Sequence, residues 1–589
     1  MTTLDVFRSS EEGVDDASGQ VLAPKRLPSV GRPVPVALLP APPPAPRPVP
    51  ELDPGAIAGR PARGAVRPIP VPEFDLAAAE ASAAHALLPT PPDDDEKFSW
   101  IDREMPVLIA FSLIAMACLT ISQLYFVMIE PMLLVFVPVI IFTLGYYLLS
   151  LRINVGSRNF DVRAHRALVS DWAPTEYPTV DVLLPICHEE QAVIRNTWNY
   201  VADMAATYPG RTTVYVLDDG DSPDARRLAE EMGFVYHVRE NLGWFKKAGN
   251  LRAGFDISDG EYQVIFDADF APRADFLLET LPHLDDDPGI GILQTPQFFR
   301  ASPEQSWMER GAGSVQELFY RLTQVSRNRF GASICVGSCA VYRRAALEET
   351  GGMALVDHSE DVFTGFEMTV HGWRVAYLPV PLATGLCPPD PDSFLTQQYR
   401  WCVGSMAMLR SRSFWASPLP PWNRGCFISG FMYYIHTALF AFLAPVIPII
   451  LLAFLPGHVR AANYLWILPS IAYGVVVFPL WNRGRYGVTS AMAKMLYAWA
   501  HVFAIWDMLV ARPMEWQTTG SRSGKSHTRR IWVAMSLWVG ATATLWIGLA
   551  VVRMAEVSVI DFAFLFGAGL VYAALPTMAV LEWRRSVAD

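Results

Sequence analysis

The chain has 589 residues, more than one ordinary domain requires, so we expect at least two structural units. It carries 47 Lys and Arg against 58 Asp and Glu, a net charge of -11, which argues against nucleic acid as the main partner because phosphate-backbone binders need surplus cations. The apolar fraction of 52% is high for a soluble enzyme and typical of a partly membrane-embedded one. The seven Cys residues show neither disulfide nor metal-site spacing, which favours reduced thiols.

Residues 1–98 are rich in Pro and Ala, as in the run from Pro33 to Pro50. Such a segment buries too little apolar area to offset the entropy of ordering, so we predict a disordered cytoplasmic tail. Its first residues are polar and acidic, and we therefore expect no cleavable signal peptide.

Two uncharged apolar segments lie within residues 105–151, separated by Glu130 and Pro131. Each is long enough to cross the hydrocarbon core of a bilayer as a helix. Arg152 and Arg158 follow the second segment, and basic residues prefer the cytoplasmic side, so we expect the chain to return there.

Residues 152–405 are predicted to form a cytoplasmic α/β domain. Short β-rich runs alternate with helix-patterned stretches, which predicts a mostly parallel, Rossmann-like sheet with helices on its faces. The expected strands are Val180–Leu184, Thr212–Leu217, Tyr262–Phe266 and Ile290–Gln294, and the expected helices include Val193–Met204 and Ser222–Met232. Ligands of such sheets bind at the carboxyl ends of the strands.

Apolar segments return after an interfacial stretch at 406–426. We expect two transmembrane helices within 427–482 (Phe427–Leu455 and Ala461–Trp481) and two more within 531–582. Residues 488–511 contain Lys494, His501 and Asp507, which favours an amphipathic interfacial helix over a span, and a polar cytoplasmic loop follows to residue 530. With the basic C-terminus at 583–589 inside, this gives six spans and both termini in the cytoplasm.

Two acidic motifs close two of the expected strands: Asp218-Asp219-Gly220 and Asp267-Ala268-Asp269. Side chains two residues apart in a strand point the same way, so Asp267 and Asp269 can present both carboxylates to one ligand. Hard oxygen ligands of this kind suit Mg²⁺ or Mn²⁺. A solvated turn is the alternative for either motif alone, and it is less favoured for the two together.

Two further motifs combine charged and aromatic residues. In Ser359-Glu360-Asp361 a carboxylate could take a proton from an acceptor hydroxyl, with Asp361 as the candidate base, while a helix N-cap is the alternative. In Gln397-Gln398-Tyr399-Arg400-Trp401 the guanidinium suits a leaving diphosphate, and the indole offers a flat face to a sugar ring. An interfacial aromatic belt is the alternative for the second motif.

In this order the four motifs resemble the D, D-x-D, (T/S)-E-D and Q-x-x-R-W series of the processive members of glycosyltransferase family 2, the cellulose synthases in particular. Three other stretches share the resemblance: Lys247–Leu251, Gln294–Phe299 and Gly337–Arg344. The resemblance implies a GT-A domain inserted in an α-helical transmembrane bundle. It also implies inverting, processive transfer from a UDP-sugar, UDP-glucose or a close relative, to a β-linked glycan exported across a bacterial-type inner membrane.

The resemblance also implies roles for individual residues. Glu189, Asp218 and Asp219 would hold the uridine, with Lys247 near the diphosphate. Asp267 and Asp269 would hold Mg²⁺ or Mn²⁺ and the diphosphate, which Arg400 would also face. Asp361, next to Glu360, would be the base. The acceptor site would be lined by Cys335, Gly337, Ser338, Cys339, Gln397 and Trp401. An accessory export subunit is a candidate partner, beside the growing glycan and the bilayer.

The sequence departs from the usual family pattern at a few positions. His188 precedes Glu189 where Asn or Asp is usual, Ser359 replaces the commoner Thr, and Trp516–Gly520 occupies the place of the gating loop. No soluble domain follows the last expected span, so we expect no cyclic-di-GMP-binding PilZ domain. The alternative enzyme is a non-processive family 2 transferase that adds one sugar to a lipid or short glycan. A transporter with a degenerate soluble domain is less favoured, because an inactive site needs no such set of charged residues.

Overall fold

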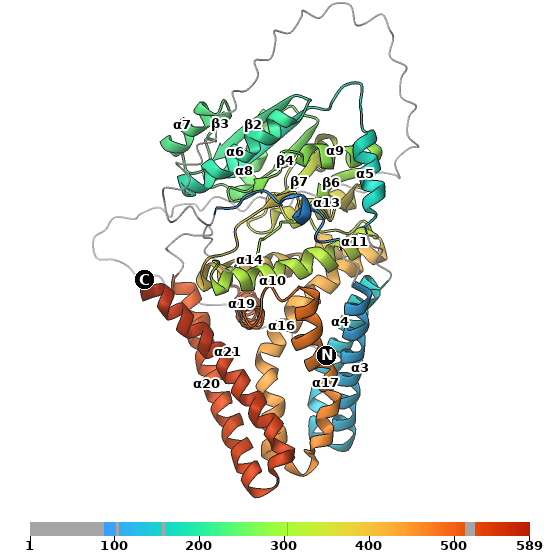
Figure 1. Ribbon diagram of the computed structural model, residues 1–589, viewed down its shortest axis with the longest axis vertical. Coiled ribbons are helices and arrows are strands. Elements are labelled where there is room, and N and C mark those ends of the chain that lie inside the picture. Colours follow the sequence, from blue (N-terminus) through green and yellow to red (C-terminus); the bar gives the residue numbers. More distant parts are fainter. Residues whose placement is uncertain (1–87, 102–104, 156–159, 303, 513–524, 589) are drawn as a thin grey trace, which may run out of the picture. The chain divides into compact units, whose positions relative to one another are not determined.

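The computed structural model describes residues 88–101, 105–155, 160–302, 304–512 and 525–588 (Figure 1). Most of the predicted tail and the segment Trp516–Gly520 lie outside these residues. An α/β domain occupies the upper part of Figure 1, and long apolar helices run below it.

The centre of the α/β domain is a seven-stranded sheet of order β3-β2-β1-β4-β7-β6-β8. The predicted mostly parallel sheet is confirmed, since strands β3 to β4 pair in parallel and only β7 runs antiparallel to both of its neighbours. The strands are β1 (Val180–Ile186), β2 (Thr212–Asp218), β3 (Val235–His237), β4 (Tyr262–Ile265), β6 (Ile290–Gln294), β7 (Ala340–Arg343) and β8 (Arg374–Tyr377), and a separate two-stranded sheet pairs β5 (Ala271–Pro272) with β9 (Ala383–Thr384).

Helices cover both faces of the sheet, which explains why β1 is buried along its whole length. Val182 packs in one hydrophobic cluster with Trp198 of α6 (Gln191–Thr207). The next residue, Leu183, packs in a second cluster with Leu251 of α8 (Lys246–Ile257). Side chains alternate along a strand, so adjacent residues anchor the two layers. The remaining helices of the domain are α5 (Val162–Asp171), α7 (Pro223–Glu231), α9 (Phe276–Asp286), α12 (Arg344–Thr350) and α13 (Glu360–Val370).

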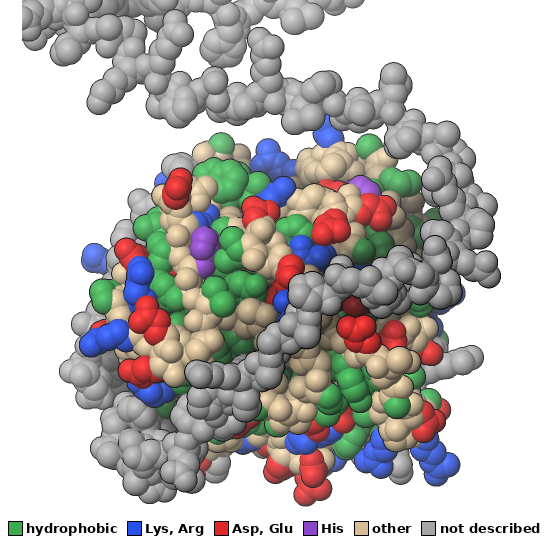
Figure 2. Space-filling view, turned by 90° about the horizontal axis from the view of Figure 1, so that it is seen from above, with side chains coloured by type: hydrophobic (Ala, Val, Ile, Leu, Met, Phe, Trp, Pro, Cys, Tyr) green, Lys and Arg blue, Asp and Glu red, His purple; other side chains and the backbone are tan. Residues whose placement is uncertain are grey.

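Seen from the side opposite the apolar helices, the α/β domain carries acidic and basic side chains interspersed with apolar ones (Figure 2). Between this domain and the apolar helices lie α10 (Trp307–Leu318) and α14 (Pro391–Arg410) (Figure 1). A π-helical turn at Phe319–Gln324 joins α10 to α11 (Val325–Asn328), and the short α15 (Arg412–Ala416) follows α14.

Five helical segments among the described residues are long and apolar enough to cross a membrane: Pro106–Ile129, Pro131–Asn154, Pro421–Phe454, His527–Glu556 and Val559–Arg584. They correspond to α3 (Met105–Ile129), the 3-10 turn η3 (Pro131–Phe136) with α4 (Val137–Asn154), α16 (Pro421–Phe454), α20 (Lys525–Glu556) and α21 (Val559–Ala588). By length and composition, these five candidate spans indicate a membrane protein.

The sequence predicts one further span at Ala461–Trp481, and here the structure differs. The segment is broken into the 3-10 turn η6 (Ala461–Trp466), α17 (Leu468–Ala472), the π-helical turn η7 (Tyr473–Val477) and α18 (Phe478–Trp481), of which Leu468–Trp481 counts as a short apolar helix. Pro469 and Pro479 lack backbone N–H groups, and Gly474 lies in the π turn, so a regular α-helical hydrogen-bond ladder is interrupted.

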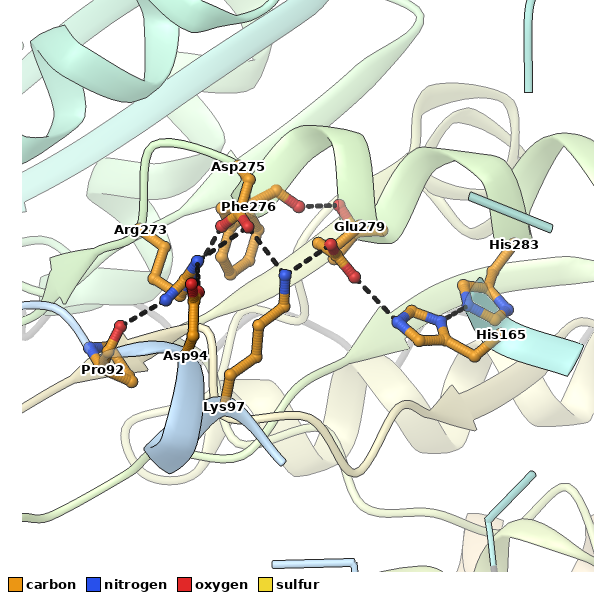
Figure 3. Close-up of polar contacts among 10 residues, drawn as sticks. Pro92, Asp94, Lys97, His165, Arg273, Asp275, Phe276, Glu279 and His283 are labelled. Carbon is orange, nitrogen blue, oxygen red and sulfur yellow. Dashed lines mark hydrogen bonds and ion pairs between the residues drawn. The ribbon is translucent and has the colours of Figure 1, made fainter. Parts of the chain in front are cut away.

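Residues 88–101, which we call the strap, correct a second expectation. Residues 88–98 fall within the predicted disordered tail, yet the strap includes the short helix α2 (Asp94–Lys97) and contacts the α/β domain. Lys97 donates to Asp275 at 2.7 Å and to Glu279 at 2.5 Å, and Glu279 in turn contacts His165 of α5 (Figure 3). The Pro/Ala composition of the whole tail hides the charged cluster at its end, whose partners lie far away in the sequence.

The expected interfacial helix is α19 (Thr489–Leu509). It packs against α10, α14 and α16, and appears nearly end-on below α14 in Figure 1. His501 and Asp507 are buried in these contacts and face protein, whereas Lys494 is exposed.

Candidate active site

The acidic motifs meet because β2, β1 and β4 are parallel neighbours in the sheet. Ile186 pairs with Asp218 at the ends of β1 and β2, and Leu183 pairs with Ile265 at the end of β4. Their carboxyl ends therefore reach the same edge of the sheet, where ligands of α/β folds bind. Glu189 lies beyond β1 at this edge, and burial raises its pKa, with Asp267 and Asp218 adding to the effect.

The first motif is held by protein donors. Asp218 is fully buried and accepts from the backbone N–H groups of Gly220 at 2.7 Å and Ser222 at 2.8 Å, and from the Tyr236 hydroxyl at 2.7 Å. Asp219 accepts a two-pronged ion pair from Arg239, with both N–O distances 2.5 Å. Such a fork is the strong form of a carboxylate contact. Both predicted uridine-binding carboxylates thus also fix the loop after β2.

Arg239 is a residue of the site that the sequence analysis missed. Its side chain is buried against Asp219, and it also donates to the carbonyl oxygens of Trp244 at 2.6 Å and Lys246 at 3.1 Å. It therefore shapes the loop that leads into α8 and Lys247. The only sequence signal is a basic residue between β3 and Lys247, where Lys246 also lies, and a single charge does not identify its partner.

The second motif lies in a turn directly after β4 instead of in the strand itself, so strand alternation is not what brings its carboxylates together. Burial raises the pKa of Asp269 to about 7, and the negative charges of Asp267 and Glu189 act in the same direction, so the three carboxylates lie within electrostatic reach of one another. The backbone N–H of Asp267 donates to the Ser338 hydroxyl at 2.9 Å.

Lys247 is the cation nearest to this group. Its ammonium donates to Asp267 and to the carbonyl oxygen of Gly337 at 3.2 Å. Burial alone lowers the pKa of Lys247, but Asp267, Glu360 and Asp361 outweigh it and raise the pKa above its ordinary value. Lys247 is thus charged and placed between the metal motif and the start of α13.

Asp361 lies in the first turn of α13, against Gly337. Burial raises the pKa of Asp361 to about 7, and the adjacent charge of Glu360 contributes in the same direction. Gly337 has a φ of +77°, and a Cβ added there would lie 3.0 Å from the Cβ of Asp361, so glycine suits both the backbone conformation and the close approach. Ser359 occupies the N-cap position of α13, but its side chain makes no capping hydrogen bond.

Helix α14 brings the fourth motif to the same place. Burial lowers the pKa of Arg400, whereas Glu360, Asp267 and Asp361 oppose that effect, so the guanidinium lies within their field. The Oε1 atom of Gln397 is buried without a protein hydrogen-bond partner among the described residues, as expected for a group that contacts a ligand. Trp401 is half-buried on the same helix.

The predicted acceptor segment divides into two parts. The thiols of Cys335 and Cys339 are packed in the two hydrophobic cores, and burial raises the pKa of Cys335 to about 12. By contrast, the Gly337 carbonyl and the Ser338 hydroxyl contact Lys247 and Asp267. Gly337 and Ser338 are as buried as these thiols, so the acceptor role expected for this segment stays a prediction.

The charges of this site are unbalanced. Five carboxylates of the described residues gather here, and Lys247 and Arg400 are the cations that act most directly on them: Glu189, Asp267, Asp269, Glu360 and Asp361. Among the described residues, no three His, Cys, Asp or Glu side chains form a group that could hold a metal ion by themselves. Mg²⁺ typically takes one or two carboxylates and completes its coordination with substrate phosphates and water. Asp267 and Asp269 fit such an ion in chemistry and in number.

The chain is similar to known glycosyltransferases. The model of the family described as glycosyl transferase family group 2 matches residues 264–477. Over 242 residues the chain is 36% identical to the UDP-forming cellulose synthase catalytic subunit of Pseudomonas fluorescens (strain SBW25), which covers 40% of this chain and 32% of that protein. Over 335 residues it is 30% identical to the UDP-forming cellulose synthase 1 catalytic subunit of Komagataeibacter xylinus, which covers 55% of this chain and 44% of that protein.

The chain thus spans less than half the length of these curated relatives. Among solved structures, it is similar to a mannosyltransferase from Pyrobaculum calidifontis in complex with GDP-Man and Mn²⁺. That match has 18% sequence identity and a TM-score of 0.44, and it covers 62% of this chain and 98% of the other.

Proposed function

The chain carries a glycosyltransferase family 2 domain with a GT-A fold among apolar helices, and from this premise we propose that it is a membrane-bound hexosyltransferase. It transfers a sugar from a UDP-sugar, UDP-glucose or a close relative, to a growing β-linked glycan. The observation that carries the proposal is the convergence of Lys247, Asp267, Asp361 and Arg400 from four separate elements.

The chemistry follows from the charges around this cluster. Asp361 accepts the proton of an acceptor hydroxyl while the hydroxyl oxygen attacks the anomeric carbon, and the bond from that carbon to the diphosphate breaks. Because the hydroxyl attacks and the diphosphate departs on opposite faces of the anomeric carbon, the configuration of that carbon inverts. A raised pKa makes Asp361 a stronger base than an ordinary carboxylate, although it must be ionised to act.

The leaving UDP needs positive charge. Arg400 and Lys247 supply it from two sides, the guanidinium offering a planar fork to phosphate oxygens and the ammonium a point charge. Asp267 and Asp269 would hold a divalent cation, which would supply further positive charge beside the diphosphate. Glu189, Asp218 and Asp219 border the uridine, with Asp218 and Asp219 acting largely by fixing the loop on which it rests.

Export of the product fits the polar aromatic side chains between the candidate membrane helix α16 and the expected interfacial helix α19. Tyr433, Tyr434 and Tyr497 surround His501, with ring centroids 5.9, 4.8 and 5.1 Å from the imidazole. His501 also shares a hydrogen bond of 2.7 Å with the Thr437 hydroxyl. Rings with polar tips can stack on sugars and bond their hydroxyls. We therefore assign to α16 and α19 part of the path of the glycan, from a cytoplasmic site across the plasma membrane.

The test uses the purified full-length protein in lipid with labelled UDP-glucose, UDP-N-acetylglucosamine and UDP-galactose. The proposal expects UDP release and a polymer whose β-linkages are identified by linkage analysis, with both lost in Asp361→Asn. A product that carries one added sugar would replace polymerisation with single transfer. Failure to release UDP from any of these donors, with Mg²⁺ or Mn²⁺ present, would refute the transferase activity itself.

A further inference from the structure

Helix α14 presents two different sides, one to the candidate active site and one to α19. Tyr399 precedes Arg400 and lies about 100° from it around the helix axis. The Tyr399 hydroxyl donates to the Oδ2 atom of Asp507 on α19 at 2.9 Å. Both residues are buried, with 4% and 3% of their surfaces exposed, so this contact is protected from water.

Asp507 also binds α20. Arg530 donates to the two carboxylate oxygens at 2.7 and 3.3 Å, and Arg512 lies 3.7 Å from the carboxylate. One carboxylate therefore joins α14, α19 and α20. A buried charge is stable only where donors satisfy it, and these three partners supply that requirement.

A second carboxylate fixes the start of α14. Asp392 accepts from the indole N–H of Trp532 on α20 at 2.9 Å and from that of Trp583 on α21 at 3.1 Å. The two indoles stack with centroids 5.1 Å apart. Helix α14 is thus bonded to the C-terminal helix pair near its first turn and again two turns later, which restricts both sliding and rotation.

We propose that Asp507 is a positioning residue for sugar transfer. This inference rests on the function proposed above. Through Tyr399, Asp507 fixes the rotation of α14 and so holds the Arg400 guanidinium where the diphosphate departs. The Arg400 guanidinium lies in the field of the active-site carboxylates, on a different side of α14 from Tyr399, so the coupling runs through the helix itself. Because positioning matters most when charge develops, the consequence is a loss of turnover more than of substrate binding.

Tyr399→Phe is the most direct perturbation, because it keeps the ring and removes only the donor. We expect kcat for UDP release to fall by about tenfold while KM for the UDP-sugar changes by less than about twofold, since misplacement of about 1 Å can cost a hundredfold. Asp507→Asn should act in the same direction. Tyr464→Phe is the matched control: it removes a Tyr hydroxyl that donates to the backbone carbonyl of Asp561, away from α14, and it should leave kcat unchanged.

The deciding measurement combines Tyr399→Phe with Arg400→Lys. If Asp507 acts through Arg400, Tyr399→Phe has little further effect once the guanidinium is gone, and the double variant matches Arg400→Lys within about twofold. Independent, multiplying losses would show that Tyr399 only supports the fold and would overturn the inference, as would wild-type kcat in Tyr399→Phe. Absence of UDP release in the wild-type protein would refute the proposed function instead. If Asp507→Asn does not purify, the Tyr399 cycle still decides.

Discussion

A methyl group at residue 404 tests whether the fit between α14 and α13 places the catalytic base. Gly404 on α14 faces Ser359, and a Cβ at that position would lie 1.9 Å from the Ser359 Oγ and 2.6 Å from its Cβ. The Ser359 hydroxyl can rotate away, but the position of its Cβ is fixed by the backbone. In Gly404→Ala the two Cβ atoms must therefore move apart from 2.6 Å to at least 3.4 Å, the lower bound of ordinary contact.

That displacement should also move the carboxylate of Asp361, because Ser359 is only two residues before it, at the start of α13. A shift of the base by most of an ångström should lower the initial rate of UDP release by about tenfold or more. The partner change Ser359→Gly removes the colliding atoms and leaves the His358 carbonyl oxygen 3.7 Å away as the nearest remaining neighbour. Residue 359 has a φ of +58°, which glycine adopts readily.

The assay compares wild type, the two single variants and the double variant at saturating UDP-sugar, with thermal unfolding as a check on folding. We expect Gly404→Ala to be slow, and the double variant to recover most of the rate of Ser359→Gly alone. A wild-type rate in Gly404→Ala would refute the steric reasoning, as would a double variant no faster than Gly404→Ala.

Three further predictions concern the base, the metal and the strap. The rate of UDP release should rise about tenfold per pH unit and level off above about pH 7, because Asp361 acts when ionised and its pKa is raised to about 7. A flat profile from pH 5 to 8 would contradict the role of Asp361 as the base. A chelator should abolish UDP release, and added Mg²⁺ or Mn²⁺ should restore it. Asp269→Ala should need a higher metal concentration for its half-maximal rate. An unchanged metal requirement in that variant would exclude Asp269 as a ligand. Lys97→Met should lower the melting temperature, since losing one partner of a buried ion pair costs about 3–5 kcal/mol. Arg227→Met, at an exposed ion pair, should leave it unchanged. Equal melting temperatures of the two variants would show that the strap is not held by its charges.

The features that sequence reasoning predicted are those with local signals. Strand ends could be located because β1, β2 and β4 are short apolar runs followed by acidic residues, and a parallel sheet necessarily brings such ends to one edge. Long uncharged segments likewise identify membrane helices from composition alone. The sequence order of the motifs was therefore enough to predict the fold class.

The features it missed depend on contacts between distant residues. Arg239 belongs to the site because Asp219 lies opposite it, and the burial of the Cys335 and Cys339 thiols depends on which face of the segment meets the two cores. The strap forms because Arg273 and Arg300 offer partners to Asp94 and Glu96 about 180 to 200 residues earlier. None of these pairings leaves a periodic or compositional trace in the sequence.

The strap also determines which residues must be exchanged together when this α/β domain is swapped between related proteins. Asn196, Arg273 and Arg300 donate to Pro89, Pro92 and Pro91, on the other side of the first two apolar helices in the sequence. A chimera that replaced residues 160–420 alone would leave these donors facing a foreign segment. The transplantable unit is discontinuous, and it includes fourteen residues (88–101) that precede the first membrane helix.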